Sequence, residues 1–350
     1  MAIKILSLFS ILLFSSSISF AKNLSDKDIS TYSPIIIKST TFRAEPNNGD
    51  YFLANDFAKG FLELGFSTDI DYRKEYHRPH TPSPKVSIYM RGYTKFYPPF
   101  DAGINILYVY YPMTFNSNSS KKINKQTLNS RPPMPQNANL DDDFQNFDII
   151  AVASPTNTKT LNQNGIKAIY IPQFTNPNKF YPAPKDDLKT DILFVGSNWH
   201  DRTSLRYAIE QGFDVSVYGY NWENVIPSQM YKAPYIPNDI LNQYYSSAKI
   251  VLNDHRPDMK ELGFINNRIY DATASGALVI SDYMKEIEDI YHECIPMYKT
   301  KEELKELLNY YLTHEPKRKE LAQCARQITL QKFTHTTVAT QIINTLNTLK

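Results

Sequence analysis

The stretch Gly263-Phe-Ile-Asn-Asn-Arg-Ile-Tyr-Asp-Ala-Thr-Ala-Ser-Gly-Ala-Leu-Val-Ile-Ser-Asp282 decides the fold, because it reads as a helix followed by a buried strand. Asn266 or Asn267 can cap the helix, whose free amides attract anions, and Arg268 in the first turn adds a full positive charge. Small residues in the second half let the helix lie close to a sheet. The Leu-Val-Ile run has the continuous apolar character of a strand covered on both faces. The stretch therefore predicts a parallel α/β sheet beside an anion-binding helix.

A plainer interpretation of the same helix stays open. Arg268 and Asp271 lie three residues apart, so they share one face of the helix. On a surface helix they could simply pair with each other, which contributes only a few tenths of a kcal/mol.

The stretch also resembles a known family. Its pattern is an arginine, an aromatic residue, an acidic residue, a small-residue run that ends in glycine, and a strand closed by aspartate. These residues are Arg268, Tyr270, Asp271, Gly276 and Asp282. The pattern is similar to the nucleotide-sugar half of GT-B glycosyltransferases, in particular to the group-1-like family that includes the spore-maturation CgeB proteins. The resemblance runs from Val86 to the C-terminus and implies two doubly wound, Rossmann-like α/β domains that face each other across a cleft.

The resemblance implies positions for a nucleotide-sugar site. Arg268 would stabilise the donor phosphates and Asp271 would hold the ribose, with no catalytic base assigned. The donor-binding candidates are Gly196, Ser197, Arg202, Gly219, Trp222, Gly263, Phe264, Asn267 and Ser275. The acceptor-side candidates, taken from loops and strand ends of the N-terminal half, are Arg43, Asn48, Arg91 and Pro112.

The chain departs from the family pattern at the carboxylates. Many retaining GT-B enzymes carry two glutamates eight residues apart. Here Gly263 and Asp271 occupy these two positions, and the nearest upstream carboxylate is Glu261. A degenerate transferase without activity is therefore one alternative to an active enzyme.

The resemblance implies transfer of a sugar from a nucleoside-diphosphate sugar to an acceptor hydroxyl, with retention and without a bound metal. The nucleotide sugar is then a substrate and no cofactor is expected, while the acceptor is a glycan, a lipid or a protein. An exported solute-binding protein without catalysis is a rival from another class, because it too combines a leader segment with two α/β domains.

Composition agrees with an ordinary two-domain globular protein. The 350 residues are 42% hydrophobic and 21% charged, and the net charge of +2 gives no basis for binding nucleic acid. The expected divisions are residues 1–21 as a signal peptide or anchor, 33–172 as the acceptor-side domain with a mobile loop at 116–139, 190–332 as the donor domain, and 333–350 as a crossover helix.

The N-terminus and the expected donor point to different compartments. Residues 1–21 have the apolar core and small cleavage residues of a secretory signal, which indicates export or membrane association. Nucleotide sugars are instead normally kept on the cytoplasmic side. Cys294 and Cys324 cannot form a disulfide framework, although one bridge between them is compatible with the sequence. The oligomeric state is left open.

Overall fold

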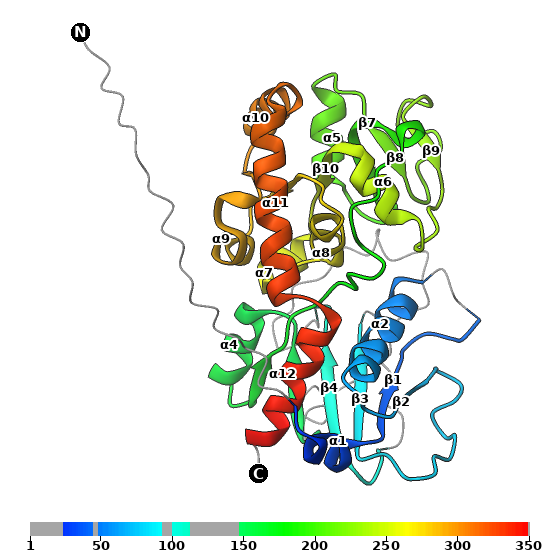
Figure 1. Cartoon of the computed structure of the whole chain (residues 1–350). Helices are drawn as coiled ribbons and strands as arrows, with labels where there is room; N and C mark the ends of the chain where they lie inside the picture. The colour runs from blue at the N-terminus through cyan, green and yellow to red at the C-terminus, as the bar shows by residue number, and fades with distance from the viewer. Residues whose placement is uncertain (1–23, 45–47, 93–99, 113–146, 349–350) are drawn as a thin grey trace, which may run out of the picture.

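The computed structural model describes residues 24–44, 48–92, 100–112 and 147–348. Over these residues the chain forms two six-stranded sheets in which every paired strand is parallel. The two sheets and their helices lie one above the other, as Figure 1 shows. Parallel sheets need helical crossovers, which cover the sheet faces and explain the apolar character of the central strands.

The first sheet is built from the N-terminal half and has the order β2-β1-β3-β4-β5-β6. Its strands are β1 (Ile35–Lys38), β2 (Thr68–Asp71), β3 (Val86–Arg91), β4 (Ile104–Val109), β5 (Ile149–Val152) and β6 (Ala168–Tyr170). The helices of this half are α1 (Asp26–Tyr32), α2 (Gly49–Glu63) and α4 (Pro155–Gln163). All four residues of β1 are buried, so this strand lies in the core of its sheet.

The second sheet has the order β12-β11-β10-β7-β8-β9. Its strands are β7 (Thr190–Val195), β8 (Ser216–Tyr218), β9 (Tyr231–Ala233), β10 (Ala248–Asn253), β11 (Val279–Asp282) and β12 (Met297–Tyr298). Its helices are α5 (Thr203–Glu210), α6 (Leu241–Ser247), α7 (Pro257–Leu262), α8 (Asn267–Ala274), α9 (Lys285–Tyr291), α10 (Lys301–Thr313) and α11 (Glu315–Lys332), with short 3-10 turns η2 (Asp186–Leu188) and η3 (His292–Cys294).

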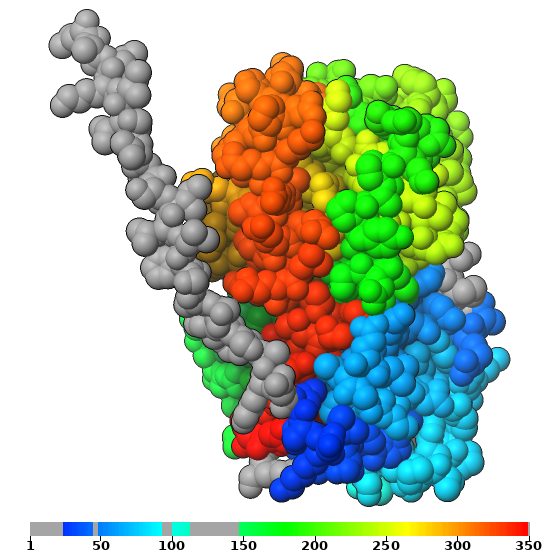
Figure 2. All heavy atoms as spheres, viewed as in Figure 1, coloured from blue at the N-terminus to red at the C-terminus, as the bar shows by residue number. Residues whose placement is uncertain are grey.

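The last helix returns to the first half of the molecule. α12 (His335–Thr348) packs against α2, and its apolar residues join the core of the first sheet. In Figure 1 it continues downward from α11 and ends near α1, and in Figure 2 it lies on the surface of the lower half, beside the N-terminal segment drawn in blue. Two backbone hydrogen bonds to Thr175 fix the chain where it passes from α11 to α12. The Thr175 amide donates to the Phe333 carbonyl, and the Thr175 carbonyl accepts from the His335 amide, each at 2.9 Å.

Apolar runs in the sequence mark the central strands, whereas three short strands carry no such run. β2, β9 and β12 lie at or near sheet edges, where a strand buries little and so carries little apolar pattern. The predicted signal segment 1–21 and loop 116–139 lie outside the described residues. Across the described part of the chain, no helix is both long and apolar enough to cross a membrane.

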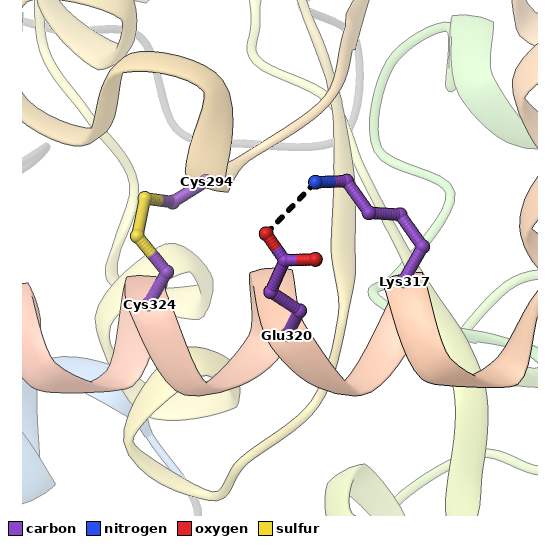
Figure 3. Close-up of a disulfide and its surroundings, with 4 residues drawn as sticks. All are labelled: Cys294, Lys317, Glu320 and Cys324. Carbon is purple, nitrogen blue, oxygen red and sulfur yellow. Dashed lines mark hydrogen bonds and ion pairs between the residues drawn. A yellow bond between two sulfur atoms is a disulfide. The ribbon is translucent and has the colours of Figure 1, made fainter. Parts of the chain in front are cut away.

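The two cysteines form a disulfide. Cys294 in η3 is bonded to Cys324 in α11, as Figure 3 shows, with a Cα–Cα distance of 5.5 Å. The bridge ties α11 to the segment that follows α9, on the face of the second sheet where Tyr291 and Phe333 pack together. The sequence left this bridge open as one alternative, because only the fold places two residues 30 positions apart in contact.

Candidate functional site between the two sheets

A cavity of about 380 Å³ lies between the two halves of the molecule. It opens at the carboxyl ends of strands from both sheets, where ligands bind in open α/β folds. From the first half, and from the linker of residues 172–189 that joins the two halves, it is lined by Gly49, Asp50, Phe52, Leu53, Asp56, Tyr110, Tyr111, Gln173, Phe174 and Phe180. From the second half it is lined by His200, Arg202, Asn238, Asp254, Arg256, Met259, Asn266, Asn267, Arg268 and Asp271.

The start of α8 points into this cavity. Asn266 occupies the N-cap position, as the sequence predicted, but its side chain makes no capping bond to the helix. Its amide instead donates to the Asp254 carbonyl at 2.9 Å, which ties the start of the helix to the loop after β10. The first amides of a helix have no partner within the helix, so this end of α8 presents donors and positive potential.

Three arginines from three segments line the same side of the cavity. Arg202 precedes α5, Arg256 follows β10, and Arg268 lies in the first turn of α8. We call these three residues the arginine wall. Arg268 does not pair with Asp271: its guanidinium donates to the Val195 carbonyl and to the Asn253 side chain, each at 2.8 Å. Arg202 donates to Asp254 at 3.3 Å, and Arg256 contacts Asp258 at 2.8 Å.

The positive charge of the arginine wall is concentrated and partly desolvated. Burial, with the neighbouring Arg268 charge, lowers the pKa of Arg202 to about 10. His200 lies within the field of all three arginines, and burial together with their charges lowers its pKa to about 3. The histidine is therefore neutral at physiological pH. A site with this charge distribution attracts a polyanion such as a diphosphate.

Two glycines let the backbone come close to these arginines. A Cβ at Gly196 would lie 2.7 Å from Nη2 of Arg268, and a Cβ at Gly219 would lie 2.2 Å from the Gly196 carbonyl oxygen. Gly219 also has a φ of +148°, which side-chain-bearing residues rarely adopt. The turns after β7 and β8 can therefore pack together only with glycine at both positions.

Several buried polar atoms of the cavity lack a protein partner. Among the residues that the structure describes, these include His200 Nε2, Asn266 Oδ1 and Asn267 Oδ1. Buried polar atoms are nearly always hydrogen-bonded in folded proteins, because leaving one unpaired costs about 1–3 kcal/mol. Three such atoms on residues that line one cavity indicate that a polar ligand or ordered water satisfies them.

Asp271 lies in the cavity on the linker side of α8. Its carboxyl accepts from Thr175 Oγ1 at 2.6 Å and from Asn267 Nδ2 at 3.0 Å. Burial is the largest cause that raises its pKa to about 8, and the nearby Asp56 charge adds to the shift. Asp56 itself is bonded to Asn176 at 2.7 Å and Lys179 at 2.6 Å. At neutral pH the Asp271 carboxyl is therefore largely protonated and can donate as well as accept.

The other donor-side candidates support the cavity rather than line it. Ser197 Oγ accepts from the Tyr220 amide, and Trp222 Nε1 donates to the Gly196 carbonyl at 2.7 Å. Gly263 ends α7 with a positive φ, Phe264 is fully buried in the core of the first sheet, and Ser275 is buried where α8 ends. Arg202, Asn267, Arg268 and Asp271 line the cavity.

The acceptor-side candidates are dispersed. Arg43 is exposed and forms a two-pronged contact with Glu75, while Asn48 caps the start of α2 by accepting from the Asp50 amide. Arg91 is buried and donates to the Gly92 carbonyl. Pro112 directly follows Tyr111, which does line the cavity.

Several lining residues received no role from the sequence. Asp254 and Arg256 lie in the loop that follows β10, and Tyr110 and Tyr111 directly follow β4. The rule that ligands bind at the carboxyl ends of parallel strands could have identified all four residues. Gln173 donates to the carbonyls of Tyr110 and Ile265. The rule could not have identified it, because Gln173 belongs to the linker and does not follow the end of a strand in this way.

Metal-ligating residues are not clustered in the part of the chain described. No group of three or more His, Cys, Asp or Glu side chains is placed there to hold a metal ion. His80 lies within 3.0–3.1 Å of both Asp71 carboxylate oxygens.

Comparison with known proteins agrees with the resemblance inferred from the sequence. Residues 191–344 match a family model described as Glycosyl transferase-like. The spore protein CgeB of Bacillus subtilis (strain 168) is 26% identical over 205 residues, a match that covers 50% of this chain and 63% of CgeB. The chain therefore matches less than two thirds of the length of this relative. These findings confirm the resemblance to CgeB-like GT-B glycosyltransferases.

Solved structures with the same architecture include several glycosyltransferases. Sucrose-phosphate synthase from Thermosynechococcus elongatus has a TM-score of 0.63 at 13% identity, and covers 90% of this chain and 98% of its own. Anabaena HepE in complex with UDP and glucose has a TM-score of 0.60 at 11% identity, covering 90% and 99%. T4 phage β-glucosyltransferase has a TM-score of 0.52 at 16% identity, covering 90% and 98%. At these identities the likeness establishes the fold, which is GT-B.

Proposed function

Since the described chain has the GT-B fold and its C-terminal part is glycosyl transferase-like, we propose that it transfers a sugar from a nucleoside-diphosphate sugar to an acceptor hydroxyl. The observation that carries this proposal is the arginine wall beside the start of α8, in a cavity between two Rossmann-like sheets. HepE was solved with UDP and with UDP-glucose, which supports the same class of donor here.

The arrangement suits the departure of a diphosphate. In the reaction, an acceptor oxygen bonds to the anomeric carbon, the bond from that carbon to the diphosphate oxygen breaks, and the acceptor proton is released. Negative charge grows on the leaving diphosphate. Arg202, Arg256, Arg268 and the first amides of α8 would stabilise this charge, and they are held in place before the reaction begins.

Asp271 would bind the donor ribose. Its carboxyl already accepts from Thr175 and Asn267, which fixes its orientation. A protonated carboxyl next to a diphosphate site also avoids repulsion between two anions. The ribose hydroxyls can both donate to and accept from such a group.

The proposal includes metal-independent transfer and retention of the anomeric configuration. Guanidinium groups can supply the countercharge that a divalent ion supplies elsewhere. Retention is supported by the resemblance to retaining GT-B enzymes. Activity that persists in a chelator and a product with the donor's anomeric configuration, observed by NMR, would agree with both statements. Loss of activity in the chelator, restored by a divalent ion, would refute the first, and an inverted product would refute the second.

Nucleotide binding tests the proposal directly. The full chain is titrated with UDP, GDP, CMP and free sugars in a thermal-unfolding assay, together with Arg268→Ala and Arg256→Ala. A nucleoside diphosphate at a hundred times its Kd stabilises the fold by about 2.7 kcal/mol. Removing one charge-assisted contact should weaken binding roughly 10- to 100-fold.

Arg206→Ala is the matched control, because Arg206 is an exposed arginine of the same domain whose partners are Asp201 and Glu210. This variant should bind like the natural protein. Stabilisation by free sugars alone would instead favour the solute-binding class. No stabilisation by any nucleotide, or equal losses in the control and the two wall variants, would contradict the proposed donor site.

A further inference from the structure

A chain of hydrogen-bonded side chains supports the arginine wall from outside the cavity. It joins the carboxyl ends of two neighbouring strands, because β10 ends at Asn253 and β11 ends at Asp282. Asn253 lies opposite Ser281 in the register of the sheet, and both residues are fully buried. None of these three residues is among those that line the cavity. Any effect that they have on a ligand must therefore pass through another side chain.

The hydrogen bonds run from Arg268 to a buried carboxylate. Nη1 of Arg268 donates to Asn253 Oδ1 at 2.8 Å, and Asn253 Nδ2 donates to Ser281 Oγ at 3.0 Å. Ser281 Oγ then donates to Asp282 Oδ1 at 3.1 Å. Asp282 is also bonded to His255, through the ring Nδ1 at 2.8 Å and the backbone amide at 3.2 Å. We call Asn253, Ser281 and Asp282 the support chain.

The chemistry of its two ends fixes the direction of every hydrogen bond in the support chain. A guanidinium only donates, so the side-chain oxygen of Asn253 must face Arg268 and its NH2 group must face Ser281. An ionised carboxylate only accepts, so the Ser281 hydroxyl must donate to Asp282. Burial opposes ionisation of Asp282, but the contacts with His255 and a nearby lysine more than offset it, and its pKa lies below the ordinary value. The Asn253 amide therefore has one allowed orientation.

These contacts leave one edge of the Arg268 guanidinium for a ligand. Nε is held by the Val195 carbonyl and Nη1 by Asn253 Oδ1, each at 2.8 Å. Within the described residues Nη2 donates to no protein atom, and it lies beside Gly196, where a Cβ would come within 2.7 Å of it. The guanidinium carbon lies 5.2 Å from the centre of the Phe194 ring. Because the guanidinium is planar, two held nitrogens also set the direction of the Nη2 hydrogens.

On the premise that the arginine wall holds the donor diphosphate, we propose that Asn253 is a positioning residue for the reaction, which fixes the Arg268 guanidinium so that Nη2 faces the diphosphate. Donors that are held in place before the reaction stabilise growing negative charge without having to reorganise. An arginine that is already held also loses less side-chain entropy when it binds an anion. Asn253 should therefore strengthen diphosphate binding without touching the ligand.

A double-mutant cycle on the full chain tests this assignment. Isothermal titration calorimetry measures the affinity for UDP and for GDP of the natural protein, Asn253→Ala, Arg268→Ala and the double variant. Asn253→Ala should weaken binding of the preferred diphosphate about tenfold, the usual size for loss of a hydrogen bond to a charged group. In the Arg268→Ala background the same substitution should change the affinity by less than about twofold, because the side chain that Asn253 positions is gone.

Two further variants separate positioning from a general loss of stability. Asn242→Ala is the matched control, because Asn242 is another buried asparagine of the second half and its amide donates to the Tyr181 carbonyl. It should lower the unfolding temperature and keep the natural affinity for the diphosphate. Ser281→Ala is a smaller change that leaves Asn253 in place without the contact that orients its amide. It should weaken the diphosphate about threefold, again only while Arg268 is present.

Nitrogen-15 NMR examines the Arg268 guanidinium in the natural protein before any nucleotide is added. Its Nη hydrogens, assigned by their absence in Arg268→Ala, should give separate signals because rotation of the group is blocked. Signals averaged by rotation would overturn the assignment even if Asn253→Ala and Ser281→Ala fail to fold.

The affinities can overturn the assignment in two ways. One is natural affinity in Asn253→Ala or in Ser281→Ala, and the other is an equal loss with and without Arg268. If neither UDP nor GDP binds the natural protein, the donor site itself is refuted and this assignment falls with it. The other outcomes refute the positioning role alone, so the failure of each proposal can be told apart.

Discussion

Replacing Asp271 with asparagine should make the stability of the protein less sensitive to rising pH. The Asp271 side chain is buried, and its two oxygens accept from Thr175 and Asn267. Burial, with the Asp56 charge, raises its pKa from the ordinary 3.8 to about 8. An asparagine has the shape of the protonated carboxyl and can keep both contacts, so it should mimic the protonated state at every pH.

The direction and size of this pH effect on the unfolding free energy follow from the coupling between proton binding and folding. Because the folded-state pKa lies above the unfolded-state value, the stabilising contribution is complete below about pH 3.8 and declines as pH rises towards 8. Each pH unit in this window removes about 1.4 kcal/mol of unfolding free energy. The difference in unfolding free energy, Asp271→Asn minus natural protein, should therefore increase by about 4 kcal/mol from pH 5 to pH 8 and then level off.

Urea denaturation at half-unit pH steps from 5 to 9 measures this difference. Other titrating groups affect both proteins alike, so they cancel in the subtraction. Asp187→Asn provides the control for removing one exposed carboxylate. A difference that stays constant between pH 5 and 8, or that falls with rising pH, would show that Asp271 is ionised in the folded protein and would refute the reasoning.

Three further predictions concern the scaffold. Gly219→Ala should destabilise the fold by about 2 kcal/mol or more, measured by urea denaturation, because its Cβ would meet the Gly196 carbonyl and its φ is positive. Cys324→Ser should cost about 3–4 kcal/mol under non-reducing conditions, since the bond to Cys294 closes a loop over a separation of 30 residues. His200→Gln should reduce the loss of stability between pH 6.5 and 4, because burial lowers the folded-state pKa of His200 to about 3 and its stabilising contribution disappears as pH falls.

Each scaffold prediction has a result that would contradict it. Gly165 also has a positive φ but open space around it, so Gly165→Ala should cost less than Gly219→Ala, and equal costs would argue against the close approach. The Cys324→Ser loss should vanish when both proteins are reduced. An unchanged acid transition in His200→Gln would show that the histidine is not desolvated among the arginines.

The strong apolar runs made the sheets predictable. Four interior strands of the two sheets, Ile35–Lys38, Val86–Arg91, Ile104–Val109 and Ala248–Asn253, are covered on both faces, and this burial gives them a continuous apolar pattern. β2 carries alternating acidic residues at the edge of the first sheet, where one side is unpaired and less apolar surface is needed. Its pairing with β1 could be recognised only in three dimensions.

The sequence by itself determined the two parallel sheets, the helix that begins beside Asn266, and the presence of Arg268 and Asp271 on it, because these depend on local apolar periodicity. Only the tertiary structure decided which charges share a cavity. Arg202, Arg256 and Arg268 come from three separate segments, and Asp50 reaches the opposite wall from α2. Burial likewise decided that Asp271 binds its proton up to a pKa of about 8. Solvent access and distances between remote segments set these properties, and neither is written in the order of neighbouring residues.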